Sequence, residues 1–586
     1  MPHHPLSTPA RAAVLALSSL LCLSLALWLV FPRQMATQQL AHGYTSPVTM
    51  PWVFGEVSNG NRLIVQLPLH WFSPRRWNII PDDRLTALSV NGHAVPLDGV
   101  RPGGLSDWRR GFDIDLSPWL HSGDNQLEFT VDNYFLDGGI LLRPLPGWLT
   151  PLLAASLLPW LLALAFLFRL RRAQTLILGG ALLVLACYWG ETSWMTRNYD
   201  VLRYDGSGHL GYVGYVAHHL KLPPLNQGWE YFQPPLYYVI GAALWRWVEW
   251  LGLPPAEALQ GLALAFWLTF LAASAATLRI GLRRSPGALL LATAALALWP
   301  SGIIHGLRLG NDPPFYAAAA VATWFMLRWW RGGRRRHLYG MAIAVALALL
   351  CKSSASAVFA AAALLVGLRL LRHGRWRRPR PWMDAAGAGA VMAAGAALSL
   401  ARGVWYWWHG QAASWLIASI GTLDDSLRVP RGLRYLIPLD IPVFLTSPWV
   451  DSRDDATGRT NFWNFLLRSS LSGEFQFDGQ LQRIIAWGWG GLLLGLLFLL
   501  LARLRGLRWA PAPLWREVPW IVLSLLWLAS ILSVRIIYPF SCQADFRFIV
   551  PLLVPFIIAC VRNGAAARAM LALLAAGSAV FFVSLP

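Results

Sequence analysis

The chain has 586 residues, of which 56% are hydrophobic and only 13% are charged, and its mean hydropathy is +0.45. A soluble protein of this size carries roughly a quarter charged residues, so the composition excludes an ordinary soluble fold. Apolar runs of about 20 residues recur along most of the length, which predicts a polytopic α-helical membrane protein.

The net charge of +20 does not indicate a nucleic-acid-binding protein, because of where the arginines lie. Short arginine clusters separate the apolar runs, at 169–172, 279–284, 328–337, 372–380 and 503–508. Arginine held on one side of the membrane in this way marks the cytoplasmic loops. The five cysteines are scattered along the chain and imply no disulfide framework.

The first apolar run, residues 12–31, is long for a signal peptide and lacks a small-residue cleavage site, so we expect a retained membrane anchor. Residues 32–147 follow as a polar segment with the alternation of β-strands in "RLIVQLPL", "LTALSVNG" and "QLEFTVDN". Asn91-Gly92 is a hairpin signal within it. We therefore expect an extracytoplasmic β domain at 32–147.

The run "FDIDLSPWLHSGDNQLEFTVDN" in this segment resembles jelly-roll, galactose-binding-like modules, which implies a β-sandwich. Sugar binding by the domain is an open question at this stage. Its tryptophans are candidates to stack on a sugar ring, although core or membrane-facing packing is the simpler interpretation: Trp71, Trp77, Trp108 and Trp119.

The apolar runs predict thirteen spans, at about 12–31, 149–168, 174–190, 258–278, 286–305, 314–328, 338–351, 354–371, 383–401, 485–504, 519–537, 548–561 and 568–585. The run 235–253 is excluded, because it contains Arg246 and Glu249 among tryptophans and because counting it would place 279–284 outside. We expect it to form an interfacial helix.

This topology organises the chain into an anchor and a β domain, followed by a membrane module that is divided by outer loops. The expected segments are 1–31, 32–147, a second span with its basic turn at 148–173, a module at 174–401 with a first outer loop at 191–257, a large outer loop at 402–484, and C-terminal spans at 485–586. The acidic and histidine side chains concentrate in the outward loops, so we expect any chemistry to occur there.

The first outer loop contains "YDGSGHLGYVGYVAHHLKLPPLNQGWEYFQPPLYY". Asp205 precedes Gly206 and Gly208, which allow the chain to bend sharply and a ligand to approach the backbone. A carboxylate at the mouth of a membrane cavity can take a proton from an acceptor hydroxyl. Asp200, five residues earlier, is the alternative base.

The loop resembles the first luminal loop of the C-type glycosyltransferases (GT-C), such as protein O-mannosyltransferases and lipid A aminoarabinose transferases. Further resemblances follow in the family's order and together cover about 174–585: "GLRLGNDPPFYAAAA" (306–320), "LLCKSSASAVF" (349–359), "ARGVWYWWHGQ" (401–411), "NFWNFLLRSSLSGEF" (461–475) and "QADFRFIVPLLVP" (543–555).

The resemblance implies an inverting transferase that moves a sugar from a polyprenyl-phosphate donor to an acceptor hydroxyl on the extracytoplasmic side. Asp205 matches the family's general base. Gly206 stands where the family usually has a glutamate, so a metal held by an Asp-Glu pair has no support, and we expect no cofactor.

A donor phosphate needs cations on the outer side of the membrane. The candidates are Lys352, Arg402, Arg547 and Arg308, with snorkelling as the alternative explanation for Arg308 and Arg402. Predicted substrate contacts are His209, Tyr212, Gln233, Tyr237, Tyr238, Asp312 and Trp405. A structural histidine explains His209 equally well, and a helix N-cap explains Asp312 equally well.

The resulting hypothesis is an integral protein of the bacterial inner membrane whose site faces the periplasm, with a lipid-linked sugar and a glycan, lipid or protein acceptor as partners. One alternative is a lipid or sugar transporter (flippase), which would carry ionisable residues within its spans. Another is an oligosaccharide ligase or polymerase that uses a polyprenyl-diphosphate donor and late-loop arginines such as Arg428, Arg453 and Arg468. A sensor built on the β domain is a third.

Overall fold

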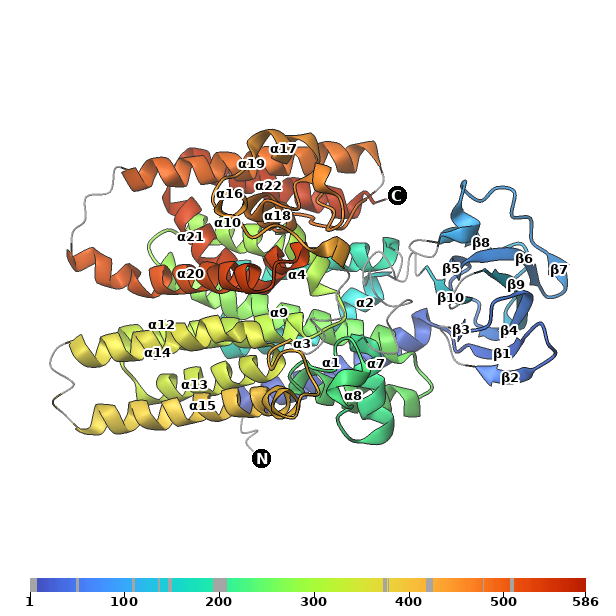
Figure 1. The fold of residues 1–586 in the computed structure, drawn as a ribbon, viewed down its shortest axis with the longest axis horizontal. Coiled ribbons are helices and arrows are strands. Elements are labelled where there is room, and N and C mark those ends of the chain that lie inside the picture. Colours follow the sequence, from blue (N-terminus) through green and yellow to red (C-terminus); the bar gives the residue numbers. More distant parts are fainter. Residues whose placement is uncertain are drawn as a thin grey trace, which may run out of the picture.

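A computed structural model of the chain describes residues 8–48, 52–107, 111–134, 138–145, 150–192, 208–372, 377, 379–417, 425–477, 479–505 and 511–585. It consists of a bundle of long helices with a β domain at one end (Figure 1). The helices run roughly along the long axis of the molecule, and the β domain lies beyond them on that axis. Asp200, Asp205 and Trp108 lie outside the described residues.

The β domain is a sandwich of two antiparallel sheets, as the alternating segments predict. One sheet has the order β2-β1-β4-β9-β6-β7 and the other β3-β10-β5-β8. The strands are β1 Met35–Gln39, β2 Thr45–Val48, β3 Trp52–Phe54, β4 Ser58–Leu69, β5 Arg76–Asp82, β6 Arg84–Val90, β7 His93–Ala94, β8 Phe112–Asp115, β9 Gly123–Asn133 and β10 Gly138–Pro144.

Alternation of side chains builds the core of the sandwich. In β4 and β9 every second residue is buried, so both strands turn an apolar face inward against the opposite sheet. Asn91 and Gly92 both have positive φ and join β6 to β7, which confirms the predicted hairpin turn. Trp77 is fully buried, whereas Trp71 is 81% exposed.

Among the described residues, ten helices are long and apolar enough to cross a membrane, or eleven if the bent pair α10–α11 is one span. The α-helices are α1 Thr8–Val30, α2 Thr150–Ser156, α3 Leu158–Phe168, α4 Arg172–Glu191, α7 His209–His219, α8 Leu236–Trp250, α9 Pro255–Gly281, α10 Pro286–Ala297, α11 Pro300–Gly306, α12 Asp312–Gly332, α13 Arg335–Cys351, α14 Ser356–Leu371, α15 Pro379–Trp408, α16 Leu433–Leu436, α17 Ile441–Thr446, α18 Phe462–Ser469, α19 Gln480–Arg505, α20 Pro511–Ile537, α21 Leu553–Arg562 and α22 Ala565–Val583.

A helix or a pair of consecutive helices lies at each of the thirteen predicted spans. Two of them, α12 and α13, fall outside the set that is long and apolar enough to cross a membrane. The first begins with Asp312 and ends among arginines, and the second has only 17 residues. The chain is thus a helical membrane protein with an N-terminal β domain, and the number thirteen stays a prediction.

The C-terminal ends of α12, α14 and α19, each next to an arginine cluster of the sequence, lie at the end of the bundle opposite the β domain (Figure 1). Arg331 Nη1 donates to the carbonyl of Ile280 at 2.7 Å, and Arg562 Nη2 donates to that of Gly281 at 2.8 Å. Both carbonyls end α9. Since the last carbonyls of a helix lack partners within it, arginines at this end satisfy them and oppose the helix dipole.

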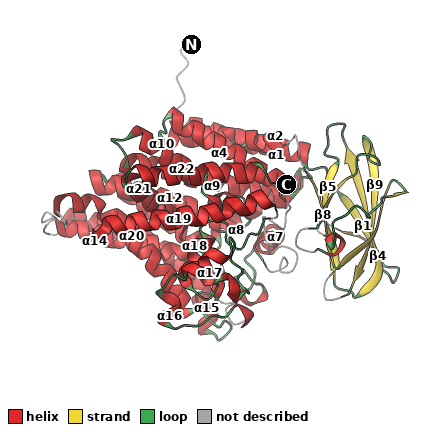
Figure 2. Ribbon diagram, turned by 90° about the horizontal axis from the view of Figure 1, so that it is seen from above, coloured by secondary structure: helices red, strands yellow, loops and turns green. Residues whose placement is uncertain are grey.

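Helix α8, the predicted interfacial helix, lies with α7 at the end of the bundle that faces the β domain (Figure 1; Figure 2 views the same junction from above). Its 15 residues reach about 22 Å, short of the roughly 30 Å of a bilayer's hydrocarbon core. Trp250 at its end is 77% exposed. Ile80 of β5 packs into the same apolar cluster as Tyr212 of α7 and Tyr238 of α8, which joins the two parts.

A buried charge pair also joins the β domain to the bundle. Arg143 Nε of β10 lies 3.7 Å from Glu257 Oε1 of α9, and these side chains are 4% and 13% exposed. The Arg143 guanidinium lies 5.4 Å from the centre of the Phe31 ring. Burial lowers the pKa of Arg143 to about 10, and Glu257 opposes this shift. The guanidinium stays charged at neutral pH.

Replacing Glu257 by Gln should destabilise this junction, because Arg143 would keep its charge and lose its buried counter-charge. Loss of one partner of a buried pair costs on the order of 3 kcal/mol. We expect faster proteolytic release of the β domain and a lower Tm in detergent. Glu128→Gln is the control: Glu128 pairs with Arg62 at the surface, at 3.2 Å, and an exposed pair contributes about 0.5 kcal/mol. Equal Tm values for both variants would contradict this role.

A polar cluster at the β-domain end of the bundle

Ionisable side chains gather where α12 begins, where α13 passes into α14, and where η10 (Phe546–Leu552) begins. The chain reverses direction at each of these points, so residues distant in sequence come together beneath the β domain. Loop residues before α8 complete the cluster. Burial of so many charges is costly unless they are paired or serve a ligand.

The centre of the cluster is an ion pair between Lys352 and Asp312. Lys352 Nζ donates to Asp312 Oδ1, and both side chains are 7% exposed. Lys352 has extended backbone between α13 and η4 (Ser353–Ala355), so the break between the helices turns its side chain toward α12. Burial opposes ionisation of Asp312, but Lys352 and Arg547 outweigh it and lower the pKa of Asp312 to about 2.

The structure does not support a capping role for Asp312. Asn311, not Asp312, occupies the N-cap of α12, and its side chain makes no capping hydrogen bond. Instead, Asn311 Nδ2 donates to the carbonyl of Cys351 at 2.9 Å and to Gln233 Oε1 at 3.0 Å. Asn311 therefore ties the end of α13 to the loop before α8, while Asp312 holds the charge of Lys352.

Arg547 stands on the other side of Asp312, at the start of η10. Asp545 caps this helix by accepting from the backbone N–H of Arg547 at 2.9 Å, and Asp545 Oδ2 lies 3.4 Å from Arg547 Nε. Tyr316 of α12 donates its hydroxyl to the carbonyl of Arg547 at 2.7 Å. The arginine is thus fixed at both backbone and side chain, within the electrostatic reach of Asp312.

His209 begins α7 and faces the same cluster. Its Nδ1 lies 2.7 Å from the hydroxyl of Tyr238, and its Nε2 lies 3.7 Å from Glu230 Oε1. Burial lowers the pKa of His209, and Glu230 opposes the shift, so the ring is neutral at pH 7. Gly310, with φ of 147°, allows this approach, because a Cβ there would lie 3.0 Å from the His209 ring.

Tyrosines form the wall between this site and the β domain. The rings of Tyr212 and Tyr238 stack with centroids 3.6 Å apart, and Tyr237 meets Tyr238 edge-on at 5.2 Å. All three side chains are buried, and burial raises the pKa of each hydroxyl. They are therefore uncharged donors and acceptors.

Arg402 and Trp405 lie on α15, at the edge of the cluster. Arg402 Nη1 donates to the Tyr212 hydroxyl at 2.7 Å, and its Nη2 donates to the carbonyl of Pro223. This arginine fastens α15 to the first outer loop. Trp405 is 51% exposed, and its ring contacts Tyr406 of the same helix and His409 directly after the helix. It lines a hollow of about 450 Å³ beside the end of α15.

Arg308 approaches the cluster from the segment after α11. Its guanidinium lies 5.8 Å from the ring centre of Phe475, and its charge lowers the pKa of both His209 and Glu474. Glu474 is the least expected member. Burial and the charge of Asp545 raise the pKa of Glu474 to about 7, so it exchanges a proton near neutrality.

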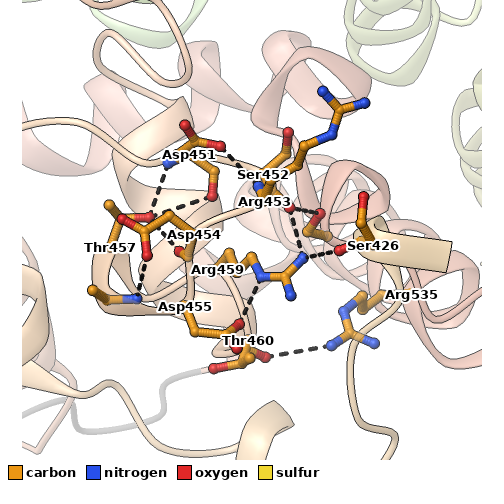
Figure 3. Close-up of polar contacts among 12 residues, drawn as sticks. Ser426, Asp451, Ser452, Arg453, Asp454, Asp455, Thr457, Arg459, Thr460 and Arg535 are labelled. Atoms are coloured by element: carbon orange, nitrogen blue, oxygen red, sulfur yellow. Dashed lines mark hydrogen bonds and ion pairs between the residues drawn. The ribbon is translucent and has the colours of Figure 1, made fainter. Parts of the chain in front are cut away.

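The segment between α15 and α19, which carries Glu474, is held by an arginine network (Figure 3). Arg459 donates from Nε to Asp455 Oδ1 at 2.6 Å and from Nη1 to the carbonyl of Ser452 at 2.9 Å. Ser541 donates to the same carbonyl at 2.7 Å. Since the hydroxyl of Ser452 bonds to Glu474, the network positions that carboxyl group.

The structure brings together ten of the predicted residues, which are linked by direct contacts or by electrostatic interactions. They are Lys352, Arg547, Arg308, Arg402, His209, Tyr212, Gln233, Tyr237, Tyr238 and Asp312. Trp405 lies beside this set, and the predicted bases Asp205 and Asp200 lie outside the described residues, in 193–207, directly before α7.

Sequence reasoning missed four members: Glu230, Asn311, Glu474 and Asp545. All four lie inside segments that carry the family resemblance, so their position was a usable signal. Within the described ranges, no three His, Cys, Asp or Glu side chains are grouped to hold a metal ion.

Comparison with known proteins adds no assignment. No family model matches the chain, and a search of the curated proteins finds no match.

Breaking the central pair should reveal strong coupling. Asp312→Asn leaves the buried Lys352 without its carboxylate partner, and Lys352→Met leaves the buried Asp312 without its ammonium partner. Each single substitution should lower the free energy of unfolding by about 3 kcal/mol. The double variant Lys352→Met/Asp312→Asn removes both charges and should be more stable than either single variant. A double-mutant cycle on Tm in detergent measures this. Additive losses would show that the two residues act independently.

Glu474 should make stability fall as pH rises. Its folded pKa of about 7 lies above its ordinary 4.5, so the folded state binds the extra proton between these values. We expect the free energy of unfolding to fall by on the order of 2 kcal/mol from pH 4.5 to 7. Measurements of Tm in detergent across this pH range follow the change. Glu474→Gln should abolish this slope, whereas exposed Glu249→Gln should keep it. A slope unchanged in Glu474→Gln would assign the proton to another group.

Proposed function

We propose that the protein is a GT-C-type membrane glycosyltransferase of about thirteen spans. It transfers a sugar from a polyprenyl-phosphate donor to an acceptor hydroxyl on the extracytoplasmic side, in the bacterial inner membrane. The observation that carries the proposal is the buried cluster of Lys352, Asp312 and Arg547 at the β-domain end of the bundle. Arginines are concentrated at the opposite end. By the arginine rule, that opposite end is cytoplasmic.

The donor phosphate would bind among Lys352, Arg547 and Arg308. An ammonium group has three N–H donors, and Asp312 accepts from Lys352 along one of them. The remaining donors suit a phosphate oxygen, and the arginines add charge-assisted bonds. Asp312 and Asp545 keep the cations charged and oriented before the donor arrives, which lowers the reorganisation needed in the transition state.

The transfer itself needs a base on the acceptor side. Asp205 would take the proton of the acceptor hydroxyl, whose oxygen attacks the anomeric carbon from the face opposite the phosphate. The bond from that carbon to the phosphate oxygen breaks, polyprenyl phosphate leaves with the electron pair, and the configuration inverts. Asp200 is the alternative base. His209 and the tyrosines at 212, 237 and 238 would line the sugar's pocket with neutral hydrogen-bonding groups.

The rival functions receive less support. The described charges gather at the two ends of the bundle, whereas a flippase needs them along its path. Of the late-loop arginines a ligase would use, Arg468 is 1% exposed and donates to the carbonyl of Phe444, while Arg428 pairs with Asp425 at 2.9 Å. These contacts are explained by the fold of the loop.

Asp205→Asn should abolish transfer, by at least about a thousandfold, because an amide cannot accept the acceptor's proton. The assay compares envelope glycans by mass spectrometry in a deletion strain complemented with wild type, Asp205→Asn or Asp200→Asn. A glycan lost in the deletion strain and in Asp205→Asn identifies the product. Full turnover in Asp205→Asn with loss in Asp200→Asn moves the base to Asp200, and no glycan difference in the deletion strain refutes the transferase.

A further inference from the structure

A second cavity lies at the other end of the bundle, far from the polar cluster. Its volume is about 440 Å³, and it opens between the C-terminal ends of α12 and α14 and the N-terminal ends of α13 and α15. These helix ends lie opposite the β domain (Figure 1). Nothing in the proposed sugar transfer uses this cavity.

Three arginines and one aspartate supply the charges of the lining. They are Arg335, Arg369, Arg380 and Asp384. Arg335 Nε lies 2.9 Å from Asp384 Oδ1, with the arginine side chain 62% exposed. Arg369 packs its guanidinium 4.8 Å from the ring centre of Trp329. The lining therefore carries a net charge of +2 and holds only one carboxylate for three guanidinium groups.

The remaining lining is apolar. It includes the side chains of Trp329, Leu338, Val366, Leu370 and Ala385. A ligand that fits both halves carries a compact anion joined to an apolar part. The planar guanidinium group is suited to phosphate, which it binds through two parallel N–H donors.

We propose that this cavity binds the phosphate of an anionic phospholipid headgroup from the leaflet at this end of the bundle. Basic pockets between helices at a membrane surface recognise such headgroups. The phosphate would lie between Arg335 and Arg380, and the start of the acyl chains would lie against Leu338 and Val366. Asp384 competes with the phosphate for Arg335 and so limits its affinity.

The cavity is coupled to the polar cluster by geometry. Helix α12 runs from Asp312 in the cluster to the cavity, and α13 returns from Arg335 in the cavity to Lys352. A lipid that holds the ends of α12 and α13 together therefore supports the register in which Asp312 meets Lys352. The proposal itself is independent of sugar transfer.

Lipid binding by the full chain tests the proposal. Purified protein in detergent is titrated with phosphatidylglycerol or with phosphatidylcholine of the same acyl chains, and bound lipid is counted by native mass spectrometry. We expect selective retention of phosphatidylglycerol. Arg335→Gln/Arg380→Gln should weaken it about tenfold or more, since each arginine near a lipid surface adds about 1 kcal/mol. Asp384→Asn should have the opposite effect and strengthen phosphatidylglycerol binding several-fold, because it removes the carboxylate that competes for Arg335.

Arg336→Gln is the matched control, because Arg336 is an exposed neighbour on α13 outside the lining. It removes one charge and should leave phosphatidylglycerol binding within about twofold. Equal losses in Arg336→Gln and the double variant would reduce the effect to general surface charge and overturn the site. Displacement of the lipid by millimolar inorganic phosphate would overturn the lipid as the source of the anion. Tm in phosphatidylcholine confirms that each variant is folded.

Discussion

The ion pair between Lys352 and Asp312 is the interaction on which the polar end of this protein depends. A buried ammonium group is tolerated only beside a carboxylate or in contact with a ligand, and here the carboxylate comes from a different helix. The pair therefore fixes the start of α12 against the break between α13 and α14. Asn311, Gly310 and His209 then take positions that follow from this placement.

Charge is segregated along the axis of the bundle, and its two ends use it differently. At the end opposite the β domain, arginines satisfy helix carbonyls and form an open basic surface. At the β-domain end, acidic and basic side chains lie together in a largely buried cluster, where each charge shifts the pKa of its neighbours. Under the proposed function, the first arrangement would set the orientation in the membrane, and the second would stabilise the charge that develops during sugar transfer.

The β domain contributes to the site by covering it. Ile80 completes the apolar cluster around Tyr212 and Tyr238, and Arg143 is anchored on Glu257 at the start of α9. Tyrosine hydroxyls buried in this way stay protonated, so this side of the polar cluster is polar without being charged. A domain that the sequence predicts as a separate insert thus packs against the residues that flank the polar cluster.

The sequence by itself determined the helical membrane class, the β domain with its Asn91-Gly92 turn, the short α8 and the segments between spans that hold the polar residues. These features follow from local periodicity, and an apolar run or an alternating strand needs no distant partner to be recognised. The resemblance also selected Lys352, Arg547 and His209 as candidates. For Asp312, the contact with Lys352 argues against the helix cap, and its contact with substrate stays a prediction.

Only the tertiary structure decided which of these residues meet. It paired Asp312 with Lys352, placed Arg402 on Tyr212, brought Glu474 into the field of Asp545, and set Trp405 beside the cluster. The physical reason is that a proton affinity or an ion pair depends on charges brought together by chain reversals across dozens to hundreds of residues. Composition and spacing carry no measure of that distance, so the partners and the basic cavity between α12 and α15 emerge only once the helices are packed.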